Sequence, residues 1–155
     1  MSTAGLRHPS LHEAMLRYVD ARTASIVEAR RELRINELDA RAVLFIGAHP
    51  GTRPGTLSAF LGVTSAGVTT LIDRLVDRRV VRRDVDPNDR RVNRITVTVD
   101  LGEAPWSALT RFDDAFSRAA GAGDPDSTLR LAHALVAYTD AATAATALPR
   151  PRSQG

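Results

Sequence analysis

The sequence predicts a mainly α-helical protein that carries one small β-hairpin. Across most of its 155 residues, apolar side chains recur every three or four positions, which is the period of an amphipathic helix. One stretch departs from that period. Around a turn signal at 86–88, apolar and polar residues alternate as they do in paired strands. Directly before it, two short helical patterns are separated by a glycine, which is typical of a helix-turn-helix.

The composition is that of an ordinary globular domain, with 43% apolar and 25% charged residues. The absence of cysteine excludes disulfides and thiolate metal sites. No apolar run reaches the roughly 18 residues that a membrane helix needs, so no membrane span is predicted. The N-terminal residues lack the apolar core of a signal peptide, and we therefore expect a cytoplasmic protein.

Two helices are predicted in the first third of the chain. The first runs from about Ser10 to Leu33, with Ser10 as its N-cap and Glu13 as the capping-box partner. The second stops at 49–51, where a histidine, a proline and a glycine follow one another. Its apolar positions are Leu38, Ala42, Phe45 and Ile46.

The helix-turn-helix pattern follows. Pro54 is suited to the first position of a short helix that ends at Leu61, and Gly62 begins the turn. Thr64 or Ser65 caps the next helix. The apolar stripe of that helix consists of Val68, Leu71, Ile72 and Leu75. Helical hairpins are common, so this pattern alone is only moderately specific for DNA binding.

The predicted hairpin pairs strands Val81–Val85 and Val92–Val99 across the turn residues 86–88. Alternation places two sets of side chains on opposite faces of the second strand, namely Ile95, Val97 and Val99 against Arg94, Thr96 and Thr98. A β-hairpin directly after a helix-turn-helix makes a winged helix, in which the hairpin is the wing.

Positive charge is concentrated in this part of the chain. All 21 basic residues are arginine, and the whole chain has a net charge of +3. From Arg74 to Arg94, eight arginines oppose four aspartates, which gives +4 and leaves the rest of the chain close to neutral. A basic stripe on a near-neutral body is typical of nucleic-acid binding, although a solvated face is the commoner meaning of such a run taken alone.

The remaining sequence predicts two more helices. One covers 106–120, with Asp113 and Asp114 on its exposed flank, and the other follows a break at 121–127 and continues to about Ala147. A winged-helix core leaves the apolar stripes of these helices and of the first helix uncovered, so we expect them to pack against each other and against a second subunit. The predicted organisation is a disordered N-terminus (1–9), a single unit (10–147) with dimerisation helices (10–34 and 103–147) around a winged-helix DNA-binding domain (36–100), and a disordered tail (148–155).

Two stretches carry a family resemblance. SAGVTTLIDRLVDRRVVRR (65–83) resembles the recognition helix of the multiple-antibiotic-resistance regulator (MarR) family of winged-helix transcription factors, and DPNDRRVNRITVTVDLG (86–102) resembles its wing. The wing match rests on an Asp-x-Arg motif followed by a strand and a glycine. Arg79-Val80 stands where the family usually has a glycine and a hydrophobic residue, and Gly102 falls one residue late.

The resemblance implies a homodimer that binds double-stranded DNA at a pseudo-palindromic operator. It further implies a transcriptional repressor that is released by a small anionic or aromatic ligand. Such a ligand is expected in a cleft between the dimerisation helices and the winged domain, where Arg17, Tyr18 and Trp106 supply aromatic walls and a cation.

The DNA contacts are expected on one face of the second helix of the helix-turn-helix and on the wing. A step of about 100° per residue places Ala66, Thr70 and Arg74 opposite the apolar stripe and Thr69 on the flank. Ser65 offers a hydroxyl and a backbone N–H to a phosphate. Arg74 either reaches guanine or phosphate, or pairs with a neighbouring carboxylate such as Asp73 or Asp77.

On the wing, one of Arg90 and Arg91 is expected to enter the minor groove, while the other pairs with Asp89 and holds the loop rigid. The sequence does not decide between the two arginines. The resemblance implies that Asp89 and Arg91 form the structural pair.

An enzyme finds little support in the sequence. The histidines show no metal-ligand spacing, and no nucleophile elbow, phosphate-binding loop or paired-carboxylate motif is present. We therefore predict no catalytic residues, no metal site and no cofactor. The alternative to a DNA-binding regulator is a winged helix used only for protein–protein contacts, which the arginine-rich wing disfavours.

Overall fold

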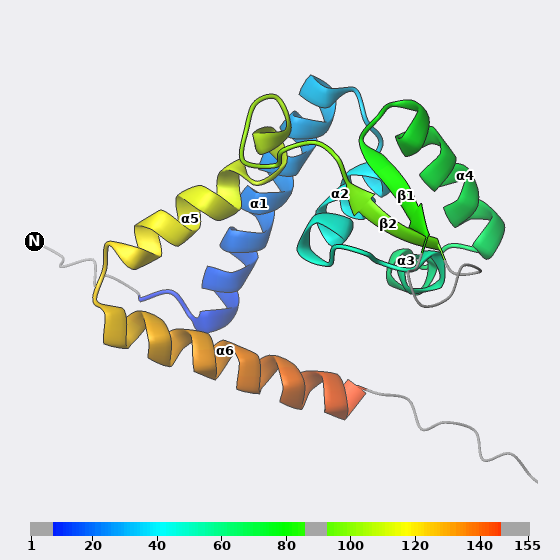
Figure 1. Cartoon of the computed structure of the whole chain (residues 1–155). Helices are drawn as coiled ribbons and strands as arrows, with labels where there is room; N and C mark the ends of the chain where they lie inside the picture. The colour runs from blue at the N-terminus through cyan, green and yellow to red at the C-terminus, as the bar shows by residue number, and fades with distance from the viewer. Residues whose placement is uncertain (1–7, 86–92, 147–155) are drawn as a thin grey trace, which may run out of the picture. The chain divides into compact units, whose positions relative to one another are not determined.

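The computed structural model describes residues 8–85 and 93–146, and it confirms a mainly helical fold with one β-hairpin (Figure 1). The chain divides into two compact units, Met1–Asp113 and Asp114–Gly155. No single helix in the described ranges is both long and apolar enough to cross a membrane. In chain order the elements are α1 (Leu11–Leu33), α2 (Glu37–Ala48), α3 (Pro54–Leu61), α4 (Ser65–Asp77), β1 (Val81–Val85), β2 (Asn93–Val97), the 3-10 helix η1 (Trp106–Leu109), α5 (Arg111–Gly121) and α6 (Pro125–Thr146).

The predicted capping box begins α1. The Glu13 N–H donates to the Ser10 hydroxyl over 3.2 Å, and the Ser10 N–H donates to the Glu13 carboxylate over 2.7 Å. These two bonds satisfy N–H groups that the first turn of a helix leaves unpaired. Because the Ser10 backbone N–H and hydroxyl both donate to the carboxylate, the pKa of Glu13 lies below its usual value.

The helix-turn-helix also forms as the sequence predicts. Gly62 ends α3 with a left-handed φ of 68°, and Thr64 caps α4 by accepting from the Gly67 N–H over 3.1 Å. The Ser58 hydroxyl donates to the Val63 carbonyl over 2.6 Å and ties the turn to the end of α3. The axes of α3 and α4 bend by 108°, within the range usual for this motif.

One core lies beneath the helix-turn-helix and the hairpin. The apolar stripe predicted for α4 is buried in full, with no side chain more than 3% exposed. Ile46 of α2, Leu57 of α3 and Ile95 of β2 are completely buried within the same cluster. Burial of one continuous apolar face fixes the rotation of α4 about its axis and so decides which residues face outward.

The hairpin is antiparallel, with Val81 opposite Val97 and Val85 opposite Asn93. A bridge between Thr52 and Ile95 adds a third chain segment beside β2. The predicted first strand has the observed bounds, whereas β2 is shorter at its end than the predicted Val92–Val99. The predicted turn at 86–88 lies outside the described residues.

The prediction of one continuous helix over 106–120 is wrong. A 3-10 turn that packs against α1 covers Trp106–Leu109, and α5 begins only at Arg111. Thr110 separates them, and its hydroxyl donates to the Leu101 carbonyl over 3.1 Å instead of facing solvent. Ala108 and Leu109 are each 1% exposed. Their burial and the Thr110 hydrogen bond stabilise the 3-10 turn, although the apolar spacing of the sequence favours a continuous α-helix.

The predicted break at 121–127 is too long, because α6 already begins at Pro125. Proline suits the first helical position, and the Ser127 N–H donates to the Asp124 carboxylate over 2.9 Å as in an N-cap. The bonds from Ser127 place the pKa of Asp124 below its usual value.

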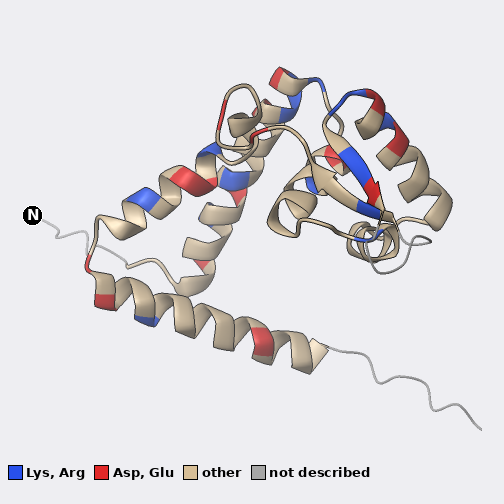
Figure 2. Cartoon of the chain, viewed as in Figure 1, with Lys and Arg blue, Asp and Glu red and all other residues tan. Residues whose placement is uncertain are grey.

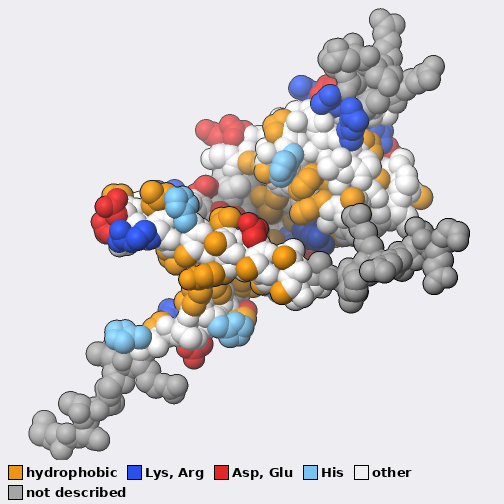
Figure 3. Space-filling model, turned by 90° about the horizontal axis from the view of Figure 1, so that it is seen from below, with side chains coloured by type: hydrophobic (Ala, Val, Ile, Leu, Met, Phe, Trp, Pro, Cys, Tyr) orange, Lys and Arg blue, Asp and Glu red, His pale blue; other side chains and the backbone are white. Residues whose placement is uncertain are grey.

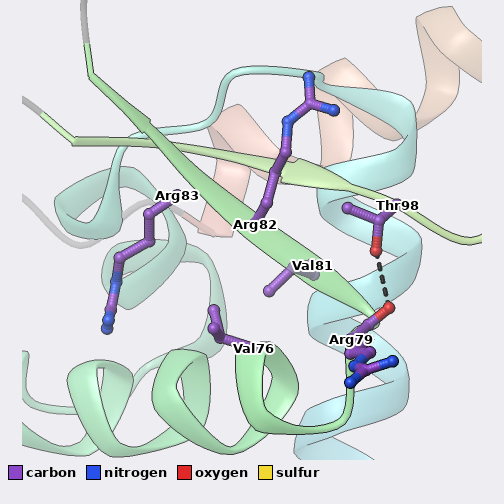
Figure 4. Close-up of a pocket in the computed structure, with 6 residues that line it drawn as sticks. All are labelled: Val76, Arg79, Val81, Arg82, Arg83 and Thr98. Carbon is purple, nitrogen blue, oxygen red and sulfur yellow. Dashed lines mark hydrogen bonds between the residues drawn. The ribbon is translucent and has the colours of Figure 1, made fainter.

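Arg79 connects α4 to β1 in a left-handed backbone conformation, with a φ of 58°. Its N–H donates to the Val76 carbonyl over 2.8 Å, and its carbonyl accepts from the Thr98 hydroxyl over 2.7 Å (Figure 4). A residue with a Cβ is strained by about 1–2 kcal/mol in this region. The strain explains why a glycine is the usual residue at this position in the resembled pattern.

We predict that the free energy of unfolding of Arg79→Gly is about 1 kcal/mol higher than that of Arg79→Ala. Urea denaturation of both variants measures the difference. Both variants lose the guanidinium, and only alanine keeps the Cβ, so their difference isolates the backbone strain. Equal stabilities of the two variants would show that the left-handed conformation is not strained.

Candidate nucleic-acid interface

The outward face of α4 carries the polar residues that the sequence singled out. Ser65, Ala66, Thr69, Thr70 and Arg74 are all exposed, opposite the buried apolar stripe. Thr64 precedes them as the N-cap, so the N–H groups of the first turn point out of the start of the helix. The positive end of the helix dipole therefore coincides with the predicted phosphate contact at Ser65.

The two threonine hydroxyls are already oriented. The Thr69 hydroxyl donates to the Ser65 carbonyl over 2.9 Å, and the Thr70 hydroxyl donates to the Ala66 carbonyl over 3.1 Å. Each hydroxyl has a single proton, so both oxygens remain available only as hydrogen-bond acceptors while these bonds persist. This refines the sequence-based expectation, which left the hydroxyls free to donate or accept.

Arg74 is bound by a carboxylate that the sequence did not indicate. Its Nε donates to Asp39 Oδ2 over 3.1 Å and its Nη2 donates to Asp39 Oδ1 over 2.5 Å. The Asp39 side chain is 2% exposed, while that of Arg74 is 42% exposed. The hydrogen bonds from Arg74 to this carboxylate raise the pKa of the guanidinium. The expected partners Asp73 and Asp77 are close in sequence, whereas Asp39 lies on α2, where no local pattern points to it.

Arg78 links α4 to the end of α1. Its terminal nitrogens donate to the Arg34 and Leu33 carbonyls over 2.9 and 3.0 Å. Carbonyls at the end of a helix lack intrahelical donors, so a cation there satisfies them and interacts favourably with the helix dipole. This arginine of the basic segment therefore holds the fold together.

Basic and acidic positions lie next to each other on the hairpin (Figure 2), and the arginines of β1 are paired with carboxylates. Arg82 Nε lies 2.9 and 3.0 Å from the two oxygens of Asp84, which also accepts from the Thr96 hydroxyl. The hydrogen bond from Arg82 is the main reason that the pKa of Asp84 lies below its usual value. Arg83 reaches across to Asp73 on α4. Asp84 is already counted in the net charge of +4 of the segment from Arg74 to Arg94, whereas Asp73 lies outside that segment and lowers its local positive charge further.

A groove of about 580 Å³ runs between the last turns of α4 and β1 (Figure 4). Val76 and Val81 supply apolar surface, and the side chains of Arg82 and Arg83 extend from opposite sides of the strand. The groove thus continues from the Asp73–Arg83 pair toward the end of α4.

The predicted wing residues Asp89, Arg90 and Arg91 lie outside the described residues. Val85 and Asn93 form the last described pair of the hairpin, so the segment 86–92 joins the two strands at that end. Which of the two arginines pairs with Asp89 stays a prediction.

The predicted ligand residues lie in two places. Arg17 and Tyr18 are on α1, where the Tyr18 ring lies 5.5 Å from that of Phe112, and Trp106 is in η1, partly buried against the core. Asp113 and Asp114 were expected on an exposed flank, and Asp114 is exposed, whereas Asp113 is partly buried. Its carboxylate accepts from Nε and Nη2 of Arg22 over 2.8 Å each, and its side chain is only 36% exposed.

A separate pocket of about 240 Å³ lies between α1 and α2. Three arginines line it, namely Arg22, Arg30 and Arg41, together with Glu37 and apolar side chains such as Ile26 and Leu44. The Glu37 carboxylate lies 3.5 Å from Nη1 of Arg30. The Nε of Arg30 is buried without a hydrogen-bond partner among the described residues. A buried donor without an acceptor is unfavourable, so this nitrogen favours an acceptor from outside the chain.

Within the described ranges, no group of three or more histidine, aspartate or glutamate side chains is placed to hold a metal ion. The geometry combines an outward polar helix face, a capped helix N-terminus and an adjoining arginine-bearing hairpin. These features define a winged-helix DNA-binding protein.

The comparisons identify the family. The MarR family model matches residues 18–92, and this part of the chain belongs to the MarR family of DNA-binding transcriptional regulators. No match was found among curated proteins.

Solved structures share the fold along nearly their whole length. The transcriptional regulator Tm0710 from Thermotoga maritima is 25% identical, with 88% of this chain and 98% of that chain covered and a TM-score of 0.55. RV1404 from Mycobacterium tuberculosis is 22% identical, with 91% and 98% covered and a TM-score of 0.60. A point mutant of MepR from S. aureus, bound to an oligodeoxyribonucleotide, is 18% identical, with 86% and 99% covered and a TM-score of 0.55.

We predict that Arg74→Ala lowers the free energy of unfolding by about 2–3 kcal/mol, because it leaves the buried Asp39 carboxylate without its donors. Arg83→Ala breaks a pair whose side chains are 36% and 52% exposed, so neither is buried, and it should change stability by less than about 1 kcal/mol. Urea denaturation of both variants provides the measurement. If both variants lose the same free energy of unfolding, the burial of Asp39 does not increase the cost of removing its partner.

Proposed function

We propose that the protein is a sequence-specific repressor that acts in the cytoplasm, binds a pseudo-palindromic operator as a homodimer and is released by a small ligand. The observation that carries this proposal is the exposed polar face of α4, held outward by the complete burial of its opposite face. The DNA-bound state of the MepR neighbour supports the same use of this fold.

In the proposed complex, the N-terminal half of α4 enters the major groove. Ala66 and Thr70 contact base edges there, with Thr69 on the flank, and Ser65 binds a phosphate at the helix N-terminus. One of Arg90 and Arg91 enters the adjacent minor groove, where the negative potential is strongest over A·T tracts.

We predict different effects for the wing and the helix. Removing the groove-binding arginine by Arg90→Ala or Arg91→Ala should weaken operator binding by about 1–3 kcal/mol and flatten the salt dependence by about one ion per subunit. Thr70→Ala should relax the preference at one base pair and leave the salt dependence unchanged. Titrations of operator and random DNA at several salt concentrations measure both effects. If neither arginine variant differs from the wild type, the wing does not contact DNA.

The homodimer is supported by apolar side chains that each unit leaves in solvent. Leu11, Leu16 and Val19 of α1 are 45–50% exposed in the first unit. In the second unit, Figure 3 shows hydrophobic side chains along α6, and they include Leu129, Leu131, Val136 and Tyr138. Exposed apolar surface on several helices is typical of subunit interfaces.

We predict a dimer in sedimentation equilibrium at micromolar concentration. Val19→Asp and Phe116→Asp should each weaken it or prevent folding, since an unpaired carboxylate in an apolar interface costs several kcal/mol. Asp20→Asn, a charge change at an exposed neighbouring position of α1, is the control. A stable wild-type monomer would contradict the dimer.

The ligand is proposed to be a small aromatic or other organic anion. The residues predicted for it are Arg17, Tyr18 and Trp106, while the pocket between α1 and α2 adds Arg30, whose buried Nε has no described acceptor. A ligand carboxylate would accept a hydrogen bond from this donor.

We predict that millimolar aromatic carboxylates, tested as a panel, raise the melting temperature and weaken operator binding. Arg30→Met keeps most of the side-chain volume and removes the donor, so it should abolish both effects without loss of DNA binding. Neutral amides of the same acids are the matched control. A panel without any effect on melting temperature or operator binding argues against an anionic ligand.

A further inference from the structure

Asp39 is unusual as a carboxylate buried beside a DNA-binding helix. It is 1% exposed in the first turn of α2, where the helix N-terminus stabilises its negative charge. Its own N–H donates to the Asn36 side chain over 2.8 Å, so the backbone that carries it is fixed by a helix cap. A carboxylate held this rigidly fixes the side chain that it binds.

The side chain that it binds is Arg74, and the geometry of the pair leaves a defined set of donors. The Asp39 carboxylate accepts hydrogen bonds from Nε and Nη2, which form the side-on edge of the guanidinium. Of the five N–H groups of an arginine, three remain, and one from each terminal nitrogen forms the end-on fork. The Arg74 side chain is 42% exposed, although the carboxylate that it binds is buried.

The end-on fork has the spacing that matches O6 and N7 of guanine in the major groove. A free arginine side chain loses rotamer entropy when it is fixed on a base. Asp39 removes that loss because the side chain is already ordered in the free protein. It also neutralises the charge of Arg74, so this arginine contributes little to the attraction of random DNA, which depends on net phosphate neutralisation.

We propose that Asp39 is a positioning residue for sequence recognition. It orders Arg74 so that its end-on fork reads a guanine, and it suppresses the non-specific contribution of that arginine. The inference rests on the proposed DNA-binding function and assigns a role to a residue of α2 outside the helix-turn-helix.

The test compares Asp39→Asn with a matched control. Asp113 on α5 binds Arg22 through the same side-on edge, with both distances at 2.8 Å, although its side chain is 36% exposed. Asp113→Asn therefore removes an ion pair of the same geometry and changes the net charge by the same amount. Genomic fragments retained by the wild-type protein define the operator. Operator and random duplex are then titrated with each full-length variant at one salt concentration, and the selection from random sequence is repeated with Asp39→Asn.

Asp39→Asn is expected to lower the ratio of operator to random affinity by about tenfold and to remove a guanine preference at one symmetric pair of positions. Asp113→Asn is expected to leave the ratio within about twofold of the wild type. If Asp39→Asn keeps both the ratio and the selected sequence, or loses affinity equally for both duplexes, Asp39 only joins α2 to α4 and the inference is overturned.

The double variant Asp39→Asn with Arg74→Gln covers the case in which the single variant does not fold. It replaces the ion pair by two amides and buries no charge, and it should show the same loss of guanine preference. Retention of that preference in the folded double variant overturns the inference. A wild-type protein that does not distinguish operator from random DNA would instead overturn the proposed function, and the inference with it.

Discussion

The burial of one face of α4 determines the rest of the DNA-binding unit. Its four apolar side chains are at most 3% exposed, so the helix cannot rotate without bringing several of them into water. Val80 and Val81, directly after the helix, are buried in the same core and fix where the hairpin starts. The outward residues and the wing are therefore placed by one packing constraint, and the strained backbone at Arg79 is the local consequence of joining them.

The basic segment is less uniform than its sequence suggests. Its net charge of +4 indicates a surface that attracts phosphate along its whole length. In the structure Arg74 is bound by a buried carboxylate, Arg78 closes the end of α1, and Arg82 and Arg83 pair with aspartates. Three of the described arginines in this segment, Arg74, Arg78 and Arg83, thus join one element to another. The planar guanidinium is well suited to this use because it binds two acceptors at once.

Local signals explain what the sequence predicts correctly. The capping box at Ser10 and the glycine turn at Gly62 act over a few residues, and the period of α4 needs only its own side chains. The errors involve distant contacts. The 3-10 turn before Thr110 depends on packing against the core, while the partners of Arg74 and Asp113 lie 35 and 91 residues away in sequence. Neither the apolar period of a helix nor the spacing of motif residues predicts pairs between such distant residues. The wing contacts stay predictions of the sequence.

The hydrogen bonds within the protein determine which groups on the outward face of α4 can donate and which can only accept. Thr69 and Thr70 already donate their only proton to the helix backbone, so toward a base they act as acceptors. In the major groove such oxygens suit the amino groups of adenine and cytosine. Arg74 has only donors, and its ordered fork suits the two acceptors of guanine. In the proposed complex each group can fulfil only one role, so a wrong base would leave a buried donor or acceptor unpaired. Specificity then follows from that penalty as much as from the contacts made with the right base.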